Sequence, residues 1–226
     1  MWSGQGRGIA FMHSATVRRI IRAYDDPIIR AYCWGRFGIL RQRFLDEIGQ
    51  YLPDEGVVLD IGCGFGLFSL YYAATGPGRV LRGLDANGRR IGVARRAAGR
   101  LGLDNAVYET GDARDFKGDG EVSAAYMLDI VHHVPASSVP PLLRALRRSL
   151  PAGGRLLVKD VEDRPAHKRA FTWLLDKAMD PTAPVHYWSG EALARALGEA
   201  GFRVHRHLMV DWLPYPHVLY IGEARP

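Results

Sequence analysis

Three alternating glycines and nearby acidic residues form the part of the sequence best suited to bind a nucleoside. Gly62, Gly64 and Gly66 follow directly after a short segment that contains Asp60. Glycine lets the backbone turn sharply and lie against a ligand where a Cβ atom would collide. Asp85 follows roughly 20 residues beyond the turn, the separation at which an acidic side chain accepts ribose hydroxyls in nucleoside-binding α/β folds. This spacing predicts a nucleoside-cofactor site at the glycine turn.

The glycine turn is expected to join a buried strand to a helix. Residues 57–61 are mostly apolar and form a run too short for a helix. Residues 67–74 are expected to form the helix that leaves the turn, and residues 80–85 the second strand. The dinucleotide fingerprint G-x-G-x-x-G does not fit, because counting from Gly62 places Leu67 where the third glycine belongs.

The sequence around this turn resembles a known family. Residues 58–66, Val-Leu-Asp-Ile-Gly-Cys-Gly-Phe-Gly, are similar to the first motif of the class I S-adenosylmethionine-dependent methyltransferases. Residues 111–113, Gly-Asp-Ala, resemble the adenine-contacting motif of that family. The resemblance covers residues 52–161 and implies an α/β fold: a Rossmann-like, seven-stranded, mostly parallel sheet with helices on both faces. Its antiparallel last strand would insert between the fifth and sixth strands.

The resemblance also implies the cofactor, S-adenosyl-L-methionine, and its product, S-adenosyl-L-homocysteine. Asp85 would accept the ribose hydroxyls and Asp112 the exocyclic amine of adenine, while Ala113 would offer a backbone donor to the ring. Cys63, inside the turn, is interpreted as a small filler residue. The residues expected to bind the cofactor are Asp60, Gly62, Cys63, Gly64, Phe65, Gly66, Asp85, Ala86, Asp112, Ala113, Leu128 and Asp129.

The fourth expected strand, residues 122–128, ends in Asp129-Ile130-Val131-His132-His133. Ligands in open α/β sheets collect beyond the carboxyl ends of the strands, so this loop is expected to face the transferred methyl group. Histidine titrates near neutral pH and can accept a proton from a hydroxyl or an acidic carbon. Two interpretations stay open: His132 or His133 is the catalytic base, or the pair supports the loop, as the resemblance implies for similar runs.

The same strand end bears on the methyl acceptor. It lacks Asn/Asp-Pro-Pro-Tyr, a run that methyltransferases acting on amino groups of nucleobases or glutamine often carry. This favours in-line methyl transfer to a small-molecule, lipid-like or carrier-bound acceptor, with nucleic acid disfavoured. The alternatives are a tRNA or rRNA methyltransferase and a non-catalytic S-adenosylmethionine-binding partner subunit. A nucleotide-dependent oxidoreductase is disfavoured by the missing third glycine.

The 226 residues suit one domain with additions. Residues 1–50 are expected to form a helical cap that belongs to the same unit, and residues 51–226 the class I methyltransferase domain. Residues 162–188 combine apolar and basic side chains and are predicted to be an inserted substrate segment beside the open sheet edge. Ordinary packing over the sheet is the alternative for this segment.

Candidate substrate contacts come from the cap and from the predicted carboxyl edge of the sheet. In the resembled family, helices before the first strand commonly cover the cofactor and shape the substrate mouth. Three cap helices are expected here, one from Ala15 to Tyr24 and two more at residues 28–32 and 37–51, which are joined around Trp34. Lys159 would either meet an anionic substrate group or form a buried pair with Asp160. The candidates are Tyr24, Tyr32, Trp34, Lys159, His167, His186, Tyr187 and His217.

The charge distribution predicts the kind of partner. The formal net charge is +6, and eight arginines lie between Arg7 and Arg43 against only Asp25 and Asp26. This imbalance favours an acidic partner such as a carrier protein or an anionic membrane surface. A solvated helix face is the alternative interpretation.

The remaining patterns predict neither a metal site nor a membrane span. Cys33 and Cys63 supply no disulfide framework and no C-x-x-C pair, and no histidine pair has the i, i+4 spacing of a helical zinc site. The sequence has no apolar run of about 18 residues and no signal-peptide pattern. We therefore expect a cytoplasmic chain, either free or docked peripherally at a membrane surface.

Overall fold

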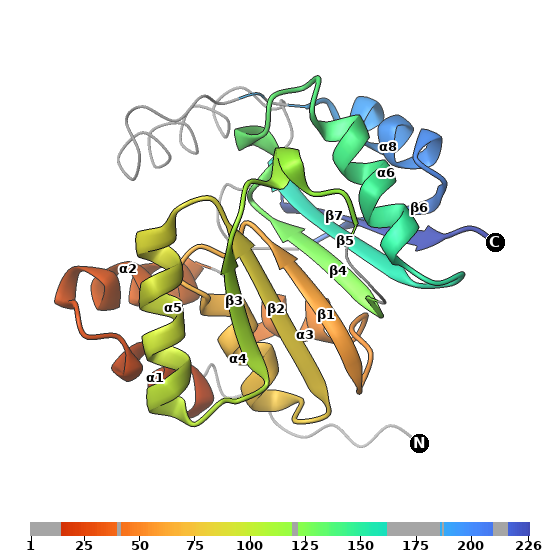
Figure 1. The fold of residues 1–226 in the computed structure, drawn as a ribbon. Coiled ribbons are helices and arrows are strands. Elements are labelled where there is room, and N and C mark those ends of the chain that lie inside the picture. Colours follow the sequence, from red (N-terminus) through yellow and green to blue (C-terminus); the bar gives the residue numbers. More distant parts are fainter. Residues whose placement is uncertain (1–14, 40–41, 119–121, 162–185, 187, 210–216) are drawn as a thin grey trace, which may run out of the picture.

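The computed structural model describes residues 15–39, 42–118, 122–161, 186, 188–209 and 217–226. Its described strands form one seven-stranded sheet in the order β3-β2-β1-β4-β5-β7-β6 (Figure 1). The strands are β1 (Gly56–Ile61), β2 (Arg79–Asp85), β3 (Ala106–Thr110), β4 (Ala124–Leu128), β5 (Arg155–Val161), β6 (Phe202–Leu208) and β7 (His217–Ala224).

The pairing of the strands confirms the predicted topology. β1 pairs in parallel with β2 and β4, β2 with β3, and β4 with β5. β7 lies between β5 and β6 and pairs antiparallel with both. The chain moves outward from β1 to β3 and then returns to β4 on the other side of β1. This reversal is where open α/β sheets bind ligands, beyond the carboxyl ends of the strands.

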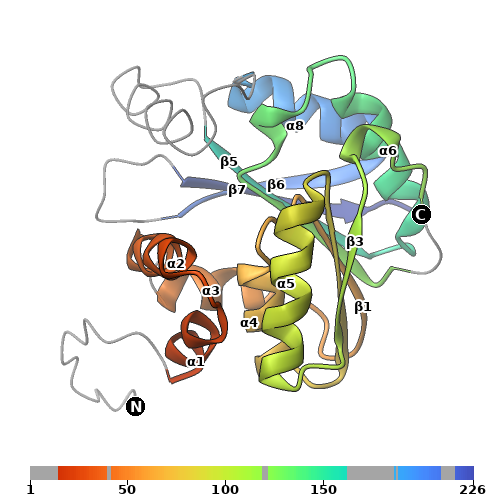
Figure 2. The same cartoon turned by 60° about the vertical axis from the view of Figure 1, so that its left-hand side comes forward.

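Helices lie on both faces of the sheet, as predicted. Figure 2 shows α1 to α5 on one side and α6 and α8 on the other. Single turns of 3-10 helix follow β3 and β4. The bounds are α1 (Ala15–Ala23), α2 (Pro27–Ile39), α3 (Gln42–Gly49), α4 (Leu67–Thr75), α5 (Gly88–Leu101), η1 (Ala113–Asp115), η2 (Val131–His133), α6 (Val139–Ser149) and α8 (Gly190–Glu199).

The helices of the cap differ from the predicted 28–32 and 37–51, because α2 ends at Ile39 and α3 begins at Gln42. Helix α2 continues through Trp34 and Gly35, where the sequence suggested a junction between two helices. Glycine within a helix costs about 1 kcal/mol relative to alanine. Packing offsets this cost, because Cys33 and Phe37 on either side of these residues are buried at 0% and 1% exposure.

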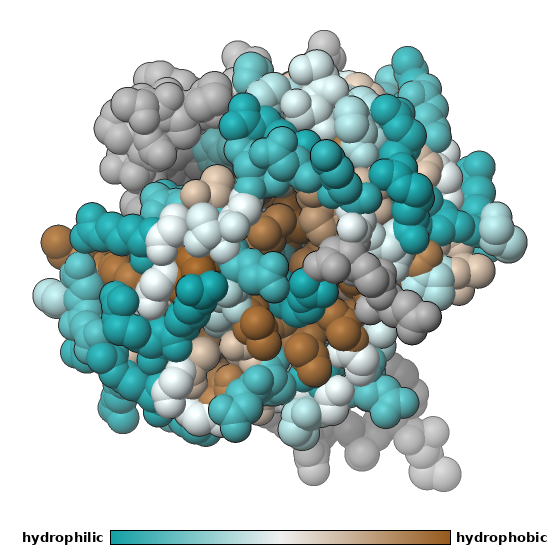
Figure 3. Space-filling view, in the orientation of Figure 1, coloured by the Kyte–Doolittle hydropathy of each residue, from teal (hydrophilic) through white to brown (hydrophobic). Residues whose placement is uncertain are grey.

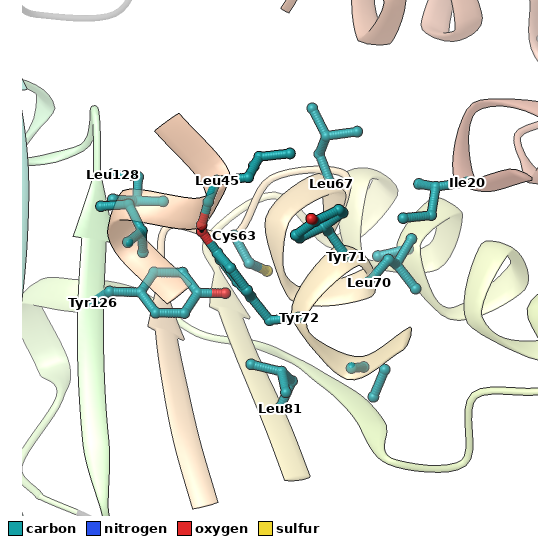
Figure 4. Close-up of a cluster of buried hydrophobic side chains, with 14 of the residues drawn as sticks. Ile20, Leu45, Cys63, Leu67, Leu70, Tyr71, Tyr72, Leu81, Tyr126 and Leu128 are labelled. Carbon is teal, nitrogen blue, oxygen red and sulfur yellow. The ribbon is translucent and has the colours of Figure 1, made fainter. Parts of the chain in front are cut away.

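Side chains from the first three helices share one hydrophobic core with the sheet. Ile20 of α1 and Leu45 of α3 belong to the same buried cluster as Tyr72 of α4 and Tyr126 of β4 (Figure 4). The Tyr72 and Tyr126 rings meet edge to face at 5.8 Å between centroids. The cap helices therefore pack directly behind the strands that carry the site, while the division of the chain at residue 50 stays a prediction.

The opposite face of β2 and β3 is less covered. The described part of the connection from β3 to β4 contains only η1. Val80 and Val107 are accordingly 38% and 44% exposed. Figure 3 shows apolar surface over this part of the sheet.

Candidate functional site

The glycine turn after β1 depends on glycine for two different reasons. Gly62, Gly64 and Gly66 have φ angles of 77°, 55° and 77°, in the left-handed region that other residues seldom adopt. A Cβ atom on Gly62 would lie 2.5 Å from Cγ1 of Ile130, and one on Gly66 would lie 2.7 Å from the hydroxyl of Tyr108. At Gly64 no atom lies within 4 Å of the Cβ position. Gly62 and Gly66 therefore permit close packing, whereas Gly64 leaves open space in front of the turn.

Asp85, at the end of β2, stands beside this open space. Its Oδ2 atom accepts a hydrogen bond from the backbone N–H of Gly64 at 2.9 Å, and Oδ1 accepts one from the N–H of Asn87 at 2.8 Å. Each oxygen of an ionised carboxylate retains a further acceptor site. The two backbone bonds therefore fix the orientation of the carboxylate and leave it able to accept two hydroxyl groups. This donor and acceptor set fits the ribose of a nucleoside cofactor.

Asp112 lies at the end of the next strand but is already bonded to its neighbour. Its Oδ1 atom accepts from the backbone N–H of Arg114 at 2.8 Å, and Oδ2 accepts from the Arg114 guanidinium at 2.6 Å. The Arg114 hydrogen bond lowers the pKa of Asp112. Exposed ion pairs of this kind are weak, so an adenine amine can compete for Oδ2. The predicted adenine contacts of Asp112 and Ala113 stay predictions, as do the contacts of exposed Ala86 and buried Leu128.

Four predicted cofactor residues have buried side chains, namely Asp85 and Leu128, which are described above, and Asp60 and Cys63. Asp60 is 3% exposed, and the Tyr126 hydroxyl donates to its Oδ2 atom at 3.0 Å. Burial raises the pKa of Asp60 to about 7. Cys63 is 8% exposed, and burial raises the pKa of its thiol. These placements favour packing roles for the Asp60 and Cys63 side chains, which for Cys63 agrees with its interpretation as a filler.

Aromatic residues of the cap hold the turn through Phe65. The Tyr24 hydroxyl donates to the carbonyl oxygen of Phe65 at 3.0 Å, and the Tyr32 ring meets the Phe65 ring edge-on at 5.8 Å between centroids. Tyr24 is 1% exposed, so its placement favours support of the turn over contact with a substrate. The structure does not bring Trp34 to the turn, because this residue is 46% exposed on the other face of α2.

An ion-pair cluster lies at the carboxyl end of β4. Asp129 accepts hydrogen bonds from the Arg36 guanidinium of α2 and from the Lys159 ammonium of β5. Lys159 is 1% exposed, and burial lowers its pKa. Asp129 has φ 58°, the only positive φ of a non-glycine residue in the described part of the chain. Such strained backbone tends to occur at functional sites. Lys159 is therefore buried in an ion pair, but the carboxylate that it bonds is Asp129, while the predicted partner Asp160 acts on it only as a nearby charge.

Arg36 was not among the residues predicted for the site. It shares the inward face of α2 with Ile29, Cys33 and Phe37, which are 8%, 0% and 1% exposed. When a charged residue falls at a position where the helical spacing predicts a buried apolar residue, its side chain is expected to pair with an opposite charge. That signal indicates a partner for Arg36 but does not identify it as Asp129.

The histidine pair after β4 is turned toward β5. Nδ1 of His132 lies 2.5 Å from Oδ1 of Asp160, and the His132 backbone N–H donates to Oδ2 at 3.0 Å. His132 and Asp160 are 1% and 5% exposed, and the His133 ring lies 4.1 Å from the His132 ring. The N–H of His186 donates to the His132 carbonyl at 2.6 Å. This geometry favours the interpretation that the histidines brace the loop, and a role as base stays a prediction.

Several predicted substrate residues cannot be placed. His167, Tyr187 and the side chain of His217 lie outside the described residues, as does most of the segment 162–188. Within the described ranges, no group of three side chains is arranged to hold a metal ion. No helix in those ranges is both long and apolar enough to cross a bilayer.

Strand order, the glycine turn and an acidic residue at the end of β2 together define the class I methyltransferase fold. A model of the methyltransferase domain matches residues 35–207, so the chain belongs to that family. The predicted family and fold are confirmed, and S-adenosyl-L-methionine is the cofactor of this class.

Three known proteins illustrate the likeness. The chain is 29% identical over 143 residues to a ribosomal RNA small subunit methyltransferase G of Beutenbergia cavernae, covering 62% of this chain and 63% of the relative. The apo structure of the S-adenosylmethionine-dependent methyltransferase SibL has a TM-score of 0.67 and 21% identity, over 88% of this chain and 58% of the other. Magnesium protoporphyrin IX methyltransferase from Synechocystis PCC 6803, solved with bound S-adenosylhomocysteine, has a TM-score of 0.65 and 19% identity, over 92% and 94%. The chain thus spans less than two thirds of the length of the ribosomal RNA methyltransferase and of SibL.

Proposed function

We propose that the chain transfers a methyl group from S-adenosyl-L-methionine to a small-molecule or lipid-like acceptor by in-line displacement. The observation that carries the proposal is the Asp85 carboxylate, held by the N–H groups of Gly64 and Asn87 beside the open face of the glycine turn. When bound, the cofactor supplies a methyl group that is already strongly electrophilic. The chain therefore has to hold the acceptor in line and remove a proton where the acceptor requires it.

The ion-pair cluster supports an acceptor that carries an acidic group. Arg36 and Lys159 place two cationic groups beside the carboxyl ends of β4 and β5, where the nearby carboxylates are Asp129, which binds both, and Asp160. The Arg36 side chain is 24% exposed, and its guanidinium has further N–H groups that can bind and orient an anionic end of a ligand. A carboxylate-bearing or phosphate-bearing small molecule, a lipid or a carrier-bound acyl group meets this requirement. A cytoplasmic location is consistent with all of these acceptors and stays a prediction.

A nucleic-acid acceptor is the second candidate, because one relative is named as a ribosomal RNA methyltransferase. The net charge of +6 also suits a polyanion. Against this, residues 129–132 read Asp-Ile-Val-His, without the Pro-Pro-Tyr run of many base-amino methyltransferases. We therefore rank the small-molecule or lipid-like acceptor first.

Calorimetric titration with S-adenosylmethionine and S-adenosylhomocysteine tests the cofactor site. Asp85→Asn keeps the shape of the side chain but removes the charge that strengthens its bonds to hydroxyls. Loss of hydrogen bonds to a charged group costs about 1.5–3 kcal/mol each, so we expect affinity to fall by at least tenfold. Glu109→Gln is the matched control, because Glu109 lies on adjacent β3, is exposed and contacts Arg82 at 3.4 Å. Equal affinity in wild type and Asp85→Asn would remove the central support of the proposal.

Transfer of a radiolabelled methyl group then tests the acceptor. Acidic lipids, fatty acids, aromatic carboxylic acids and tRNA are offered separately, and label is counted in the organic, aqueous and nucleic-acid fractions. We expect label in a lipid or small-acid fraction. Label in tRNA, with steep salt dependence, would favour the second candidate. Cofactor binding without transfer to any acceptor, even with candidate partners added, would favour a non-catalytic subunit.

A further inference from the structure

Helix α2 has two faces of different character. Successive residues of an α-helix are rotated by about 100°, so residues 29, 32, 33, 36 and 37 share one side. That side is buried or partly buried against the rest of the protein. The residues on the other side are all exposed and all uncharged. They are Pro27, Ile28, Ala31, Trp34, Gly35 and Gly38.

The outer face of α2, defined by these six residues, is unusual for a surface helix. Ile28 and Trp34 are 77% and 46% exposed, the two highest values among the exposed large hydrophobic residues of the described chain. A solvated helix face ordinarily carries charged or polar residues. Helix α5 has such a face, since four of its exposed residues are Arg89, Arg95, Arg96 and Arg100. Solvation alone therefore does not account for the outer face of α2.

Two arginines lie along one edge of this apolar face, and both nearby acidic side chains accept hydrogen bonds. Asp25 accepts from Arg100 at 2.5 Å between charged atoms, and the Asp26 side chain accepts the N–H of Ile28 at 2.8 Å. Arg30 lies at the edge of the face and is exposed, as is Arg22 of α1. The Arg30 guanidinium bonds the Arg22 carbonyl oxygen at 3.4 Å, which places the two segments side by side.

We propose that the outer face of α2 docks on an anionic membrane surface. An apolar strip with a tryptophan, flanked by arginines, is the pattern of helices that lie in the interface between water and lipid. Ile28 and Trp34 enter the headgroup boundary, and Arg22 and Arg30 approach the lipid phosphates. Helix α2 itself, residues 27–39, has no acidic residue; the nearest are Asp25, which is paired with Arg100, and Asp26.

Docking through this face brings the site to the membrane. The inner face of the same helix contacts Phe65 of the glycine turn through Tyr32 and Asp129 of β4 through Arg36. Figure 2 shows α2 on the outside of the helical layer. A lipid-like acceptor could then reach the site from the bilayer; this consequence, unlike docking itself, rests on the proposed function.

Cosedimentation with vesicles tests the docking surface. The full chain is mixed with vesicles of phosphatidylcholine alone or with an equal part of phosphatidylglycerol, at low and high salt. We expect binding to the anionic vesicles that weakens with salt. Ile28→Glu/Ala31→Glu places two carboxylates on the outer face and should weaken binding by at least about tenfold. Arg22→Gln, which removes one cation, should weaken it about fivefold.

Val107→Glu is the matched control, because Val107 is an exposed apolar residue of β3, outside the outer face of α2. It should bind vesicles as wild type does, and the thermal unfolding midpoint should show that all variants fold. Titration with S-adenosylhomocysteine in solution measures cofactor binding separately. A failure of the proposed function can therefore be told apart from a failure to bind vesicles. The proposal is overturned if wild type ignores anionic vesicles, or if the Ile28→Glu/Ala31→Glu variant binds them equally well. It is also overturned if the variant loses only self-association or binding to an acidic carrier protein.

Discussion

Replacing Asp129 by asparagine should destabilise the protein by leaving Lys159 without its anionic partner. The Lys159 ammonium is 1% exposed and donates to Oδ1 of Asp129, while the Arg36 guanidinium bonds the other oxygen. Asparagine keeps nearly the same shape but offers only an amide dipole. The buried ammonium and the partly exposed guanidinium would then keep only Asp160, which is already bonded to His132, as a nearby carboxylate.

The size of the effect follows from burial and from the ordinary pKa of lysine. Removing one partner of a buried ion pair costs about 3–5 kcal/mol of unfolding free energy. The folded protein can limit this cost if Lys159 loses its proton and becomes neutral. For an amine of ordinary pKa, deprotonation at pH 7 costs about 5 kcal/mol of free energy. Burial and the charge of Arg36 already lower the pKa of Lys159, so less than that is needed. We expect a loss of about 3 kcal/mol near pH 7.

The same reasoning fixes the sign of the pH dependence. In the variant, the pKa of Lys159 is depressed further in the folded state, while the unfolded chain keeps the ordinary value. Between these two values the unfolded chain binds more protons, so stability rises with pH. The difference in unfolding free energy between Asp129→Asn and wild type should therefore become smaller between about pH 7 and pH 10.

Urea unfolding followed by tryptophan fluorescence, near neutral pH and at about pH 9.5, measures both effects. The control Glu47→Gln breaks a helix-surface pair in which the Arg43 Nε lies 3.1 Å from Glu47, with the two side chains 69% and 16% exposed, and it should cost less than about 1 kcal/mol. Asp129→Asn/Lys159→Met removes both charges and should recover part of the loss. A change of less than about 1 kcal/mol for Asp129→Asn at both pH values would refute the view that Asp129 compensates a buried ammonium.

Two further predictions concern the glycine turn and the strand behind it. Gly62→Ala should lower the thermal unfolding midpoint strongly, because the added Cβ would lie 2.5 Å from Ile130. Gly64→Ala should destabilise the fold less, because its Cβ contacts no other atom and only the left-handed backbone conformation is strained, by about 1–2 kcal/mol. Gly64→Ala should instead weaken S-adenosylhomocysteine binding in calorimetry, and unchanged binding would show that no ligand approaches there. Asp60 has a pKa raised to about 7 by burial, so its contribution to stability is present at low pH and lost as pH rises from about 4 through 7. In urea unfolding, Asp60→Asn should reduce the change in unfolding free energy between about pH 4 and pH 7 by up to about 4 kcal/mol. The same pH dependence in the variant and in wild type would contradict a raised pKa for Asp60.

The sequence alone determined the features that depend on neighbouring residues. The left-handed glycines, for example Gly64, follow from short-range sterics that no distant contact has to supply. Asn87 caps α5 by accepting the N–H of Arg89 at 3.0 Å, and Ser189 caps α8 by accepting the N–H of Ala192, bonds that span only two or three residues. Strand order was predictable because the motifs occur in an order similar to that of a known family.

Only the tertiary structure decided which distant side chains meet. Arg36 and Asp129 are 93 residues apart, and His132 and Asp160 are 28 apart. No local pattern specifies such partners, because each pair forms only after a helix or loop packs against a particular strand. The position of Trp34 was missed for the same reason, since packing of the inward face keeps α2 continuous and turns this residue outward. Local sterics and hydrogen bonds are encoded over a few residues, whereas pairings across the sheet depend on how the whole chain packs.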